Sequence, residues 1–191
     1  MAGYYNIDDI MMEDEPVSVV FQVGANGVGL LDPGSETNSV EKGAKVDLPF
    51  WLAHELYLRQ AVSINVPACF SQKTRKEVQA DAACVDLRSR CPYFYQLGCK
   101  IVPLVGDRSI GSFLRYTFTS RYKEILSKSH SAPVSTAPKY LTCLTHEESQ
   151  LFEAARSSMA SFKKWRVGGS RLEKASILGR KRRTISHLST E

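Results

Sequence analysis

The 191-residue chain lacks any apolar run near the roughly 18–20 residues that a membrane-spanning helix needs. Its N-terminus is acidic, without the basic start and apolar middle of a secretory signal, and its first glycine is at position 3, not at the position 2 that myristoylation requires. Hydrophobic residues (43%) and charged residues (24%) occur at ordinary globular levels, which argues against wholesale disorder. We therefore expect a soluble intracellular protein, neither transmembrane, secreted nor fibrous.

The motifs of common metal and catalytic sites are also absent from the sequence. The four histidines form no HExxH, the serines form no GxSxG, and no CxxC occurs among Cys69, Cys84, Cys91, Cys99 and Cys143. An intracellular chain keeps its thiols reduced, so we expect buried or half-buried free cysteines. The sequence predicts no metal, no cofactor and no enzymatic activity.

Two stretches resemble binding sites, one for a nucleotide and one for a metal ion, but their details argue against both functions. In GANGVG (24–29) the glycines are spaced GxxGxG rather than GxGxxG, no helix pattern follows, and no Walker lysine is present. We interpret this stretch as a turn, with a nucleotide loop as the alternative. The acidic residues between Asp8 and Glu15 fit a solvated or partner-facing patch better than the shaped oxygen cage of a metal site.

Charge is unevenly distributed along the chain. The net charge is −8 over residues 1–58, +6 over residues 59–162 and +7 over residues 163–191. This asymmetry predicts two structural units followed by a basic tail. It does not by itself indicate nucleic acid, because a basic segment is also found on solvated helical faces.

The first third of the chain carries strand patterns around two short helices. A helix with Asn6 as its N-cap is expected within residues 4–14, and strands are expected over residues 16–24, 43–49 and 62–67, with a further short strand over Val28–Leu31. A second helix follows Asp47, which we expect to cap it, with Pro49 in its first turn. We predict a small β-rich domain over residues 1–66, with a linking helix near residues 49–59.

The rest of the chain has helical periodicity. Helices are expected over residues 68–84, 107–128 and 145–165, together with an apolar run over 92–105 that breaks at Pro103. Thr145 and Glu148 match a capping box, and residues 129–140 read as a loop. In the 107–128 helix we expect the basic residues, Arg121 among them, to lie away from one apolar stripe, made of Ile110, Phe113, Leu114, Phe118, Tyr122, Ile125 and Leu126.

These patterns predict an α+β fold. A small N-terminal β-rich domain is followed by a larger α-helical domain over residues 67–168 and by a disordered basic tail over residues 169–191. Phe50, Trp51 and Leu52 are expected to pack between the β-rich unit and the helices.

Three segments together resemble one family. They are YNIDDIMMEDEPVSV (5–19), KGAKVDLPFWLAHELY (42–57) and CVDLRSRCPYFYQLG (84–98). Their order and spacing are similar to those of the Psf-three subunits of GINS, the four-subunit eukaryotic replication factor, and the second segment is the most specific of the three. The resemblance covers roughly residues 5–167, and the tail follows no family pattern.

The resemblance implies a non-catalytic subunit of a heterotetramer with three paralogous GINS subunits, located in the nucleus. Through them it implies association with the MCM ring and a further accessory protein in the replicative helicase, and any contact with DNA would be indirect. A helical domain of this size buries only part of its apolar surface alone, so surplus apolar side chains are expected at interfaces. The candidates for interface or interdomain packing are Trp51, Leu52, Leu56, Phe113, Leu114, Phe118, Tyr122, Phe152, Met159 and Phe162.

Two alternatives stay open at this point. The chain could be an isolated basic nucleic-acid-binding module, which salt-sensitive binding by the lone chain would favour. The GRKRR run (179–183) could serve nuclear import through Arg180, Lys181, Arg182 and Arg183, contact a phosphate backbone, or only keep the tail soluble.

Overall fold

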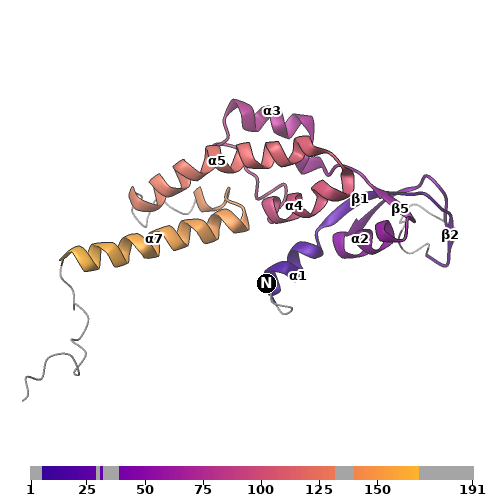
Figure 1. Ribbon diagram of the computed structural model, residues 1–191, viewed down its shortest axis with the longest axis horizontal. Helices are drawn as coiled ribbons and strands as arrows, with labels where there is room; N and C mark the ends of the chain where they lie inside the picture. Colours follow the sequence, from indigo (N-terminus) through magenta and orange to yellow (C-terminus); the bar gives the residue numbers. More distant parts are fainter. Residues whose placement is uncertain (1–5, 29–30, 32–38, 132–139, 168–191) are drawn as a thin grey trace, which may run out of the picture.

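The computed structural model describes residues 6–28, 31, 39–131 and 140–167. A small sheet with two short helices lies at one end of an elongated molecule, and a long helix projects at the other (Figure 1). Helices α3, α4 and α5 lie between these ends. This arrangement confirms the predicted α+β fold, in which a β-rich part precedes a larger helical part. The predicted tail lies outside the described residues.

The sheet has three antiparallel strands in the order β4-β1-β5, and these strands were predicted. The central strand β1 (Pro16–Phe21) pairs with β4 (Lys45–Pro49) on one side and with β5 (Val62–Ile64) on the other. Side chains alternate between core and solvent along β1 and β4, and this alternation fixes the register in which Val19 faces Val46.

A two-residue ladder joins β2 (Ala25–Asn26) and β3 (Ser39–Val40) beside the sheet. The predicted strand at Val28–Leu31 is therefore wrong at its described ends, since neither Val28 nor Leu31 is in a strand; residues 29–30 are not described. Gly27 follows β2 with φ +80°, a conformation that favours glycine, which agrees with a turn at this position.

Of the two short helices, α2 packs against the sheet, and α1 packs against α2 and α4. Helix α1 (Ile7–Glu13) begins as predicted, because the Asp8 amide donates to Asn6 Oδ1 at 3.2 Å. Helix α2 (Phe50–Leu58) has Pro49 at its N-cap and no side-chain cap. The expectation that Asp47 caps α2 is wrong: Asp47 lies within β4, paired with Ser18, because the strand continues up to the helix.

The helical part begins with a 3-10 turn, η2 (Ala68–Phe70), and helix α3 (Gln72–Ala80), whose N-cap is Ser71. Helix α4 (Phe94–Val105) continues through Pro103, so the predicted break there is wrong. Pro103 lies in the last turn, and the helix ends at Gly106, which has φ +73°. Pro103 has no amide to donate to the Cys99 carbonyl one turn earlier, and α4 ends two residues after it.

Two long helices complete the fold. Helix α5 (Arg108–Ser131) runs three residues past its predicted end, so the predicted loop over 129–140 starts later; residues 132–139 are outside the described residues. Helix α7 (His146–Val167) has the predicted capping box: the Glu148 amide donates to Thr145 Oγ1 at 3.3 Å and the Thr145 amide donates to Glu148 Oε2 at 3.2 Å. No described helix has the length and apolar character to cross a membrane.

One apolar core runs from the sheet into the helices. It includes Met12 of α1, the inner faces of β1 and β4, Phe94 of α4 and Leu114 of α5. A separate, much smaller cluster contains Ile125, Leu144 and Phe152 near the far end of α5. The β-rich and helical parts therefore share a core, whereas the far end of the molecule has only a few buried side chains.

Candidate interaction surface

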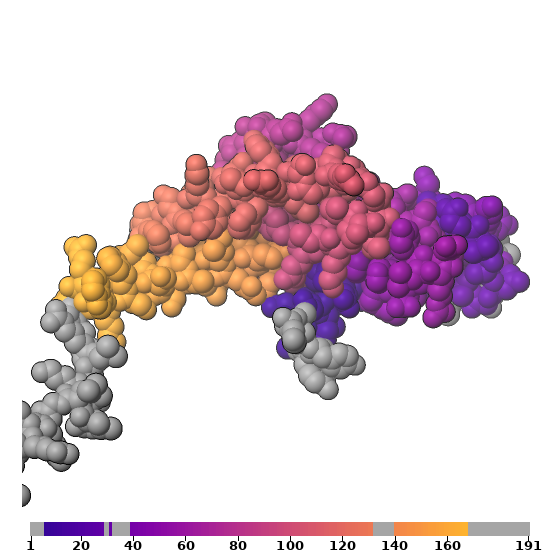
Figure 2. All heavy atoms as spheres, in the orientation of Figure 1, coloured from indigo at the N-terminus to yellow at the C-terminus, as the bar shows by residue number. Residues whose placement is uncertain are grey.

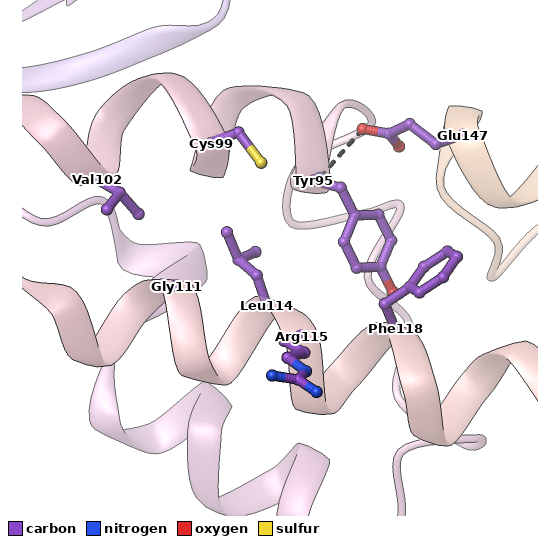
Figure 3. Close-up of a pocket in the computed structure, with 8 residues that line it drawn as sticks. All are labelled: Tyr95, Cys99, Val102, Gly111, Leu114, Arg115, Phe118 and Glu147. Atoms are coloured by element: carbon purple, nitrogen blue, oxygen red, sulfur yellow. Dashed lines mark hydrogen bonds between the residues drawn. The ribbon is translucent and has the colours of Figure 1, made fainter.

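A groove of about 470 Å³ lies between the surfaces of α4 and α5. Tyr95, Cys99 and Val102 line it from α4, at the four- and three-residue steps that place them on one helix face. Figure 3 shows the side chains of Val102, Cys99 and Leu114 directed toward the same space between the two helices. The full lining is Tyr95, Cys99, Val102, Gly111, Leu114, Arg115, Phe118 and Glu147.

An aromatic row continues the groove along α5. Tyr95 and Phe118 meet edge to face with ring centroids 5.6 Å apart, and Phe118 lies 5.6 Å from Tyr122. Phe118 is 42% exposed and Tyr122 is 38% exposed. The groove and this row form one apolar surface, which we call the aromatic groove, and nothing else in the described part of the chain covers it.

A buried ion pair supports the aromatic groove from beneath. Arg121 and Glu148 are 2% and 1% exposed. Arg121 Nε donates to Glu148 Oε1 at 2.7 Å and Nη2 donates to Glu148 Oε2 at 2.8 Å, which is a bidentate arrangement. The Tyr95 hydroxyl donates to Glu148 Oε1 at 2.7 Å. The pair thus ties α4, α5 and α7 together at one point.

The remaining donors of Arg121 are also satisfied. Nη1 donates to the carbonyls of Ala82 and Val85 at 2.6 and 2.8 Å, and Nη2 donates to the Cys143 carbonyl at 3.3 Å. Burial on its own would lower the pKa of Arg121, but the hydrogen bonds and charge of Glu148 raise it above its usual value. Burial, followed by the nearby Glu148 charge, raises the pKa of the Tyr95 phenol. Arg121 stays charged and Tyr95 stays a donor at neutral pH.

The position of Arg121 contradicts the predicted stripe of α5. The buried face instead follows Ile110, Leu114, Thr117 and Arg121, four- and three-residue steps that the sequence does contain, while Phe118 and Tyr122 lie beside it. Hydrophobicity alone favoured the two aromatics over the threonine and the arginine. Two sequence signals could have identified Arg121 as a buried residue. It lies on the same helix face as Ile110, and Glu148 of the capping box offers it a carboxylate partner.

Helix α7 has two different halves. At its start, Glu147 Oε1 accepts hydrogen bonds from the Tyr95 and Gln96 amides at 3.0 and 2.9 Å, which caps α4. Beyond Phe152 the helix extends past the end of α5 (Figure 1) and most of its residues are exposed. Phe162 and Trp165, with ring centroids 5.8 Å apart, are 49% and 70% exposed.

The ten residues predicted for interface or interdomain packing do not share one environment. Phe113, Leu114 and Phe152 are buried within the chain, and Leu52, Leu56 and Met159 are partly buried. The exposed ones are Trp51, Phe118, Tyr122 and Phe162. Only Phe118 and Tyr122 of these four lie together, in the aromatic groove. The four candidate import residues lie outside the described residues.

The predicted position of Trp51 is wrong. We expected it to pack between the β-rich part and the helices, but it is 50% exposed. The neighbouring Phe50 is buried instead and stacks on His54 with ring centroids 5.8 Å apart. Because a helix turns by about 100° per residue, burying Phe50 directs Trp51 outward.

Sulfur and acidic groups do not form a metal site within the described ranges, where no cluster of three ligating side chains occurs. Cys69 and Cys91 are buried and Cys143 is half-buried, as expected, but Cys84 and Cys99 are exposed, contrary to expectation. The acidic residues of α1 contact the helical part instead, since Glu13 pairs with Lys100 at 2.7 Å and Asp8 lies 3.2 Å from His146.

Two family models match the chain, one on each part. The GINS complex protein helical bundle domain matches residues 69–167, which is more than half of the chain. The PSF3 N-terminal domain matches residues 5–58. The first match contains the whole aromatic groove and the Arg121–Glu148 pair.

Similar full-length relatives come from fungi and vertebrates, each named DNA replication complex GINS protein PSF3. The chain is 30% identical to that of Phaeosphaeria nodorum over 86% of this chain and 96% of the relative. It is 27% identical to the Xenopus laevis protein and 28% identical to the Homo sapiens protein, each over 87% of this chain and 81% of the relative. The chain therefore belongs to the GINS PSF3 family.

Proposed function

We propose that this chain is a non-catalytic structural subunit of a heterotetrameric GINS complex that acts in nuclear DNA replication. In this proposal its three partners are the paralogous GINS subunits, and the complex joins the MCM ring and a further accessory protein in the replicative helicase. The observation that carries the proposal is the aromatic groove, an exposed apolar surface held in shape by a buried ion pair. The names of the relatives support the replication role.

The aromatic groove has the character of an obligate interface. Exposed aromatic side chains beside a recess are typical of the cores of permanent assemblies, where they enter pockets of the partner. Phe118 and Tyr122 carry the exposed aromatic area, and Leu114 forms the floor at 6% exposure. Bound against a paralogous helix, this surface would be removed from water.

The family matches also support a two-part organisation. We propose a β-rich unit over residues 1–66, a helical unit over 67–168 and a basic tail over 169–191, of which residues 170–191 are dispensable for assembly. The matches to residues 5–58 and 69–167 leave the proposed boundary between them. The shared core means that the two units would not separate freely.

Co-expression with the three paralogues tests the function. The wild-type chain should elute with them as one species in gel filtration, and Tyr122→Asp should weaken its retention at least about tenfold, because the new carboxylate would be desolvated in an apolar interface. The matched control is Tyr116→Asp on the same helix. Tyr116 has similar exposure, 46%, but lies on a different face of α5 from the groove.

Three outcomes would count against the proposal. The wild-type chain could fail to co-elute, both tyrosine variants could assemble normally, or both could fail alike. The first would exclude a GINS-type subunit, and the other two would exclude the aromatic groove as its interface. A chain ending at Gly169 that failed to assemble would show that the tail is structural.

A further inference from the structure

A second exposed face of α5 differs chemically from the aromatic groove. We call it the basic stripe; all its side chains are exposed, and they recur at three- and four-residue steps along one side of the helix: Arg108, Ser112, Arg115, Tyr116, Thr119 and Lys123. Arg115 lies where the two faces meet, since it also lines the aromatic groove. From Arg108 to Lys123 the helix advances about 22 Å. Figure 2 shows α5 open at the surface along much of its length.

The cations of the basic stripe are not neutralised within the described residues. Arg108, Arg115 and Lys123 form no ion pair there, whereas Arg75, Arg90, Lys100, Arg121 and Lys128 each have a carboxylate partner. The sequence also contains no acidic residue between Asp107 and Glu124. The stripe is therefore a line of positive charge with no compensating negative charge along it.

From this arrangement we propose that the basic stripe binds the phosphodiester backbone of a nucleic acid. Arginine, lysine, serine and tyrosine side chains donate to phosphates, and all the stripe residues except Thr119 are of these types. The Thr119 hydroxyl donates within the helix, to the Arg115 carbonyl at 2.8 Å. Tyr116, 46% exposed, adds an aromatic face on which an unpaired base can stack. The inference extends the proposed function, because a GINS subunit with this surface would contact DNA directly.

An acidic protein segment is a poorer occupant. Protein interfaces normally have an apolar centre with few charges, and the basic stripe has no large aliphatic side chain. Nucleic-acid interfaces are more polar and more positively charged. The two faces of α5 thus fit two kinds of partner: the aromatic groove fits a protein helix, and the basic stripe fits a polyanionic backbone.

The test measures binding by the full chain in its four-subunit assembly. Fluorescence anisotropy with a labelled 30-nucleotide single strand and a 30-base-pair duplex is recorded from 50 to 200 mM salt. The triple variant Arg108→Gln, Arg115→Gln and Lys123→Gln should weaken binding about tenfold at low salt. It should also reduce the slope of log affinity against log salt by about two to three, one unit for each lost phosphate contact.

A matched control carries the same charge change elsewhere. Lys42→Gln, Lys45→Gln and Arg59→Gln remove three exposed cations from the β-rich part and should leave both affinity and salt slope unchanged. Tyr116→Ala should weaken single-strand binding about fivefold or more while affecting the duplex less, because only unpaired bases stack on it. Equal weakening of single-strand and duplex binding would exclude base stacking on Tyr116 and would leave the phosphate contacts as the basis of binding.

Four results would overturn the inference. Equal binding by wild type and the triple variant would do so, as would equal losses in the triple variant and its control, which would indicate only net charge. Competition by polyglutamate as strong as by unlabelled DNA would indicate an acidic protein partner. A triple variant that no longer assembles, while Arg115→Gln alone still does, would identify the stripe as a subunit interface, because only Arg115 also lines the aromatic groove. If wild type itself fails to assemble, the proposed function fails, and the same titrations on the full chain alone still test the stripe.

Discussion

The sheet end and the α7 end of the molecule differ in how much apolar surface the chain covers by itself. At the sheet end, one continuous core joins Met12, the strands, Phe94 and Leu114. At the α7 end, the buried apolar side chains are Ile125, Leu144 and Phe152, and the helix then continues with Phe162 and Trp165 exposed. The sheet end therefore covers its apolar side chains by its own contacts, whereas the α7 end leaves apolar side chains exposed that the proposed partners would cover.

The Arg121–Glu148 pair lies where these two regions meet, and breaking it has the largest expected effect. Arg121→Ala should lower the free energy of unfolding by about 3–5 kcal/mol, because Glu148 would stay buried without its partner. Urea unfolding monitored by tryptophan fluorescence measures this change in the free energy of unfolding. Arg115→Ala, six residues earlier on the same helix and exposed, is the control and should stay within about 0.5 kcal/mol. Similar losses in both variants would show that the pair contributes nothing specific.

A pair of glycine substitutions tests the tightness of the sheet-end core. A Cβ on Gly98 would lie 2.7 Å from Leu114 Cδ1 and 3.0 Å from Phe70 Cζ, whereas a Cβ on Gly111 has nothing within 4 Å. Gly98→Ala should therefore cost about 1–2 kcal/mol, the overpacking being partly offset by better helix propensity. Gly111→Ala should stabilise by about 0.5–1 kcal/mol. Thermal unfolding compares the two variants, and stabilisation by Gly98→Ala as well would mean that Leu114 gives way freely.

Local sequence signals predicted the sheet and most helix starts. Alternating apolar residues gave β1 and β4, and short-range hydrogen bonds gave the caps at Asn6 and Thr145. The errors came where two local signals compete. Asp47 has the chemistry of a helix cap but is held in β4 by its pairing with Ser18. Pro103 costs α4 one backbone hydrogen bond, to the Cys99 carbonyl, but the helix continues for two more residues before it ends.

The candidate surface was less predictable, because it depends on which helix faces meet. Apolarity placed Phe118 and Tyr122 on the same stripe as Leu114, but α4 packs against Leu114 and leaves the two aromatic side chains partly exposed. A buried arginine cannot be inferred from hydrophobicity. Its burial requires Glu148 and three backbone carbonyls that come from segments distant in sequence. Only the tertiary fold brings these acceptors together.

The start of α7 should show a moderate effect. Thr145→Ala removes the side-chain cap and should cost about 1 kcal/mol, because the Glu148 amide loses its acceptor in a buried site. Thr145→Ser keeps the hydroxyl and is the control that should recover most of the loss. Differential scanning calorimetry measures both variants. If alanine and serine destabilise equally, the packing of the threonine methyl group matters more than the cap.

The smallest effect is expected at the far end of α7. Trp165 is 70% exposed, and its described neighbour is the ring of Phe162, so Trp165→Ala should change the unfolding free energy of the lone chain by no more than about 0.5 kcal/mol. A tryptophan covered by a partner is typically a hot spot, so if the proposed four-subunit assembly covers Trp165, the same substitution should weaken association by about 2 kcal/mol or more. Gel filtration across a dilution series measures that second value. An equal, negligible effect in both settings would mean that the projecting helix remains uncovered, and the dependence of this end on a partner would then rest on the aromatic groove alone.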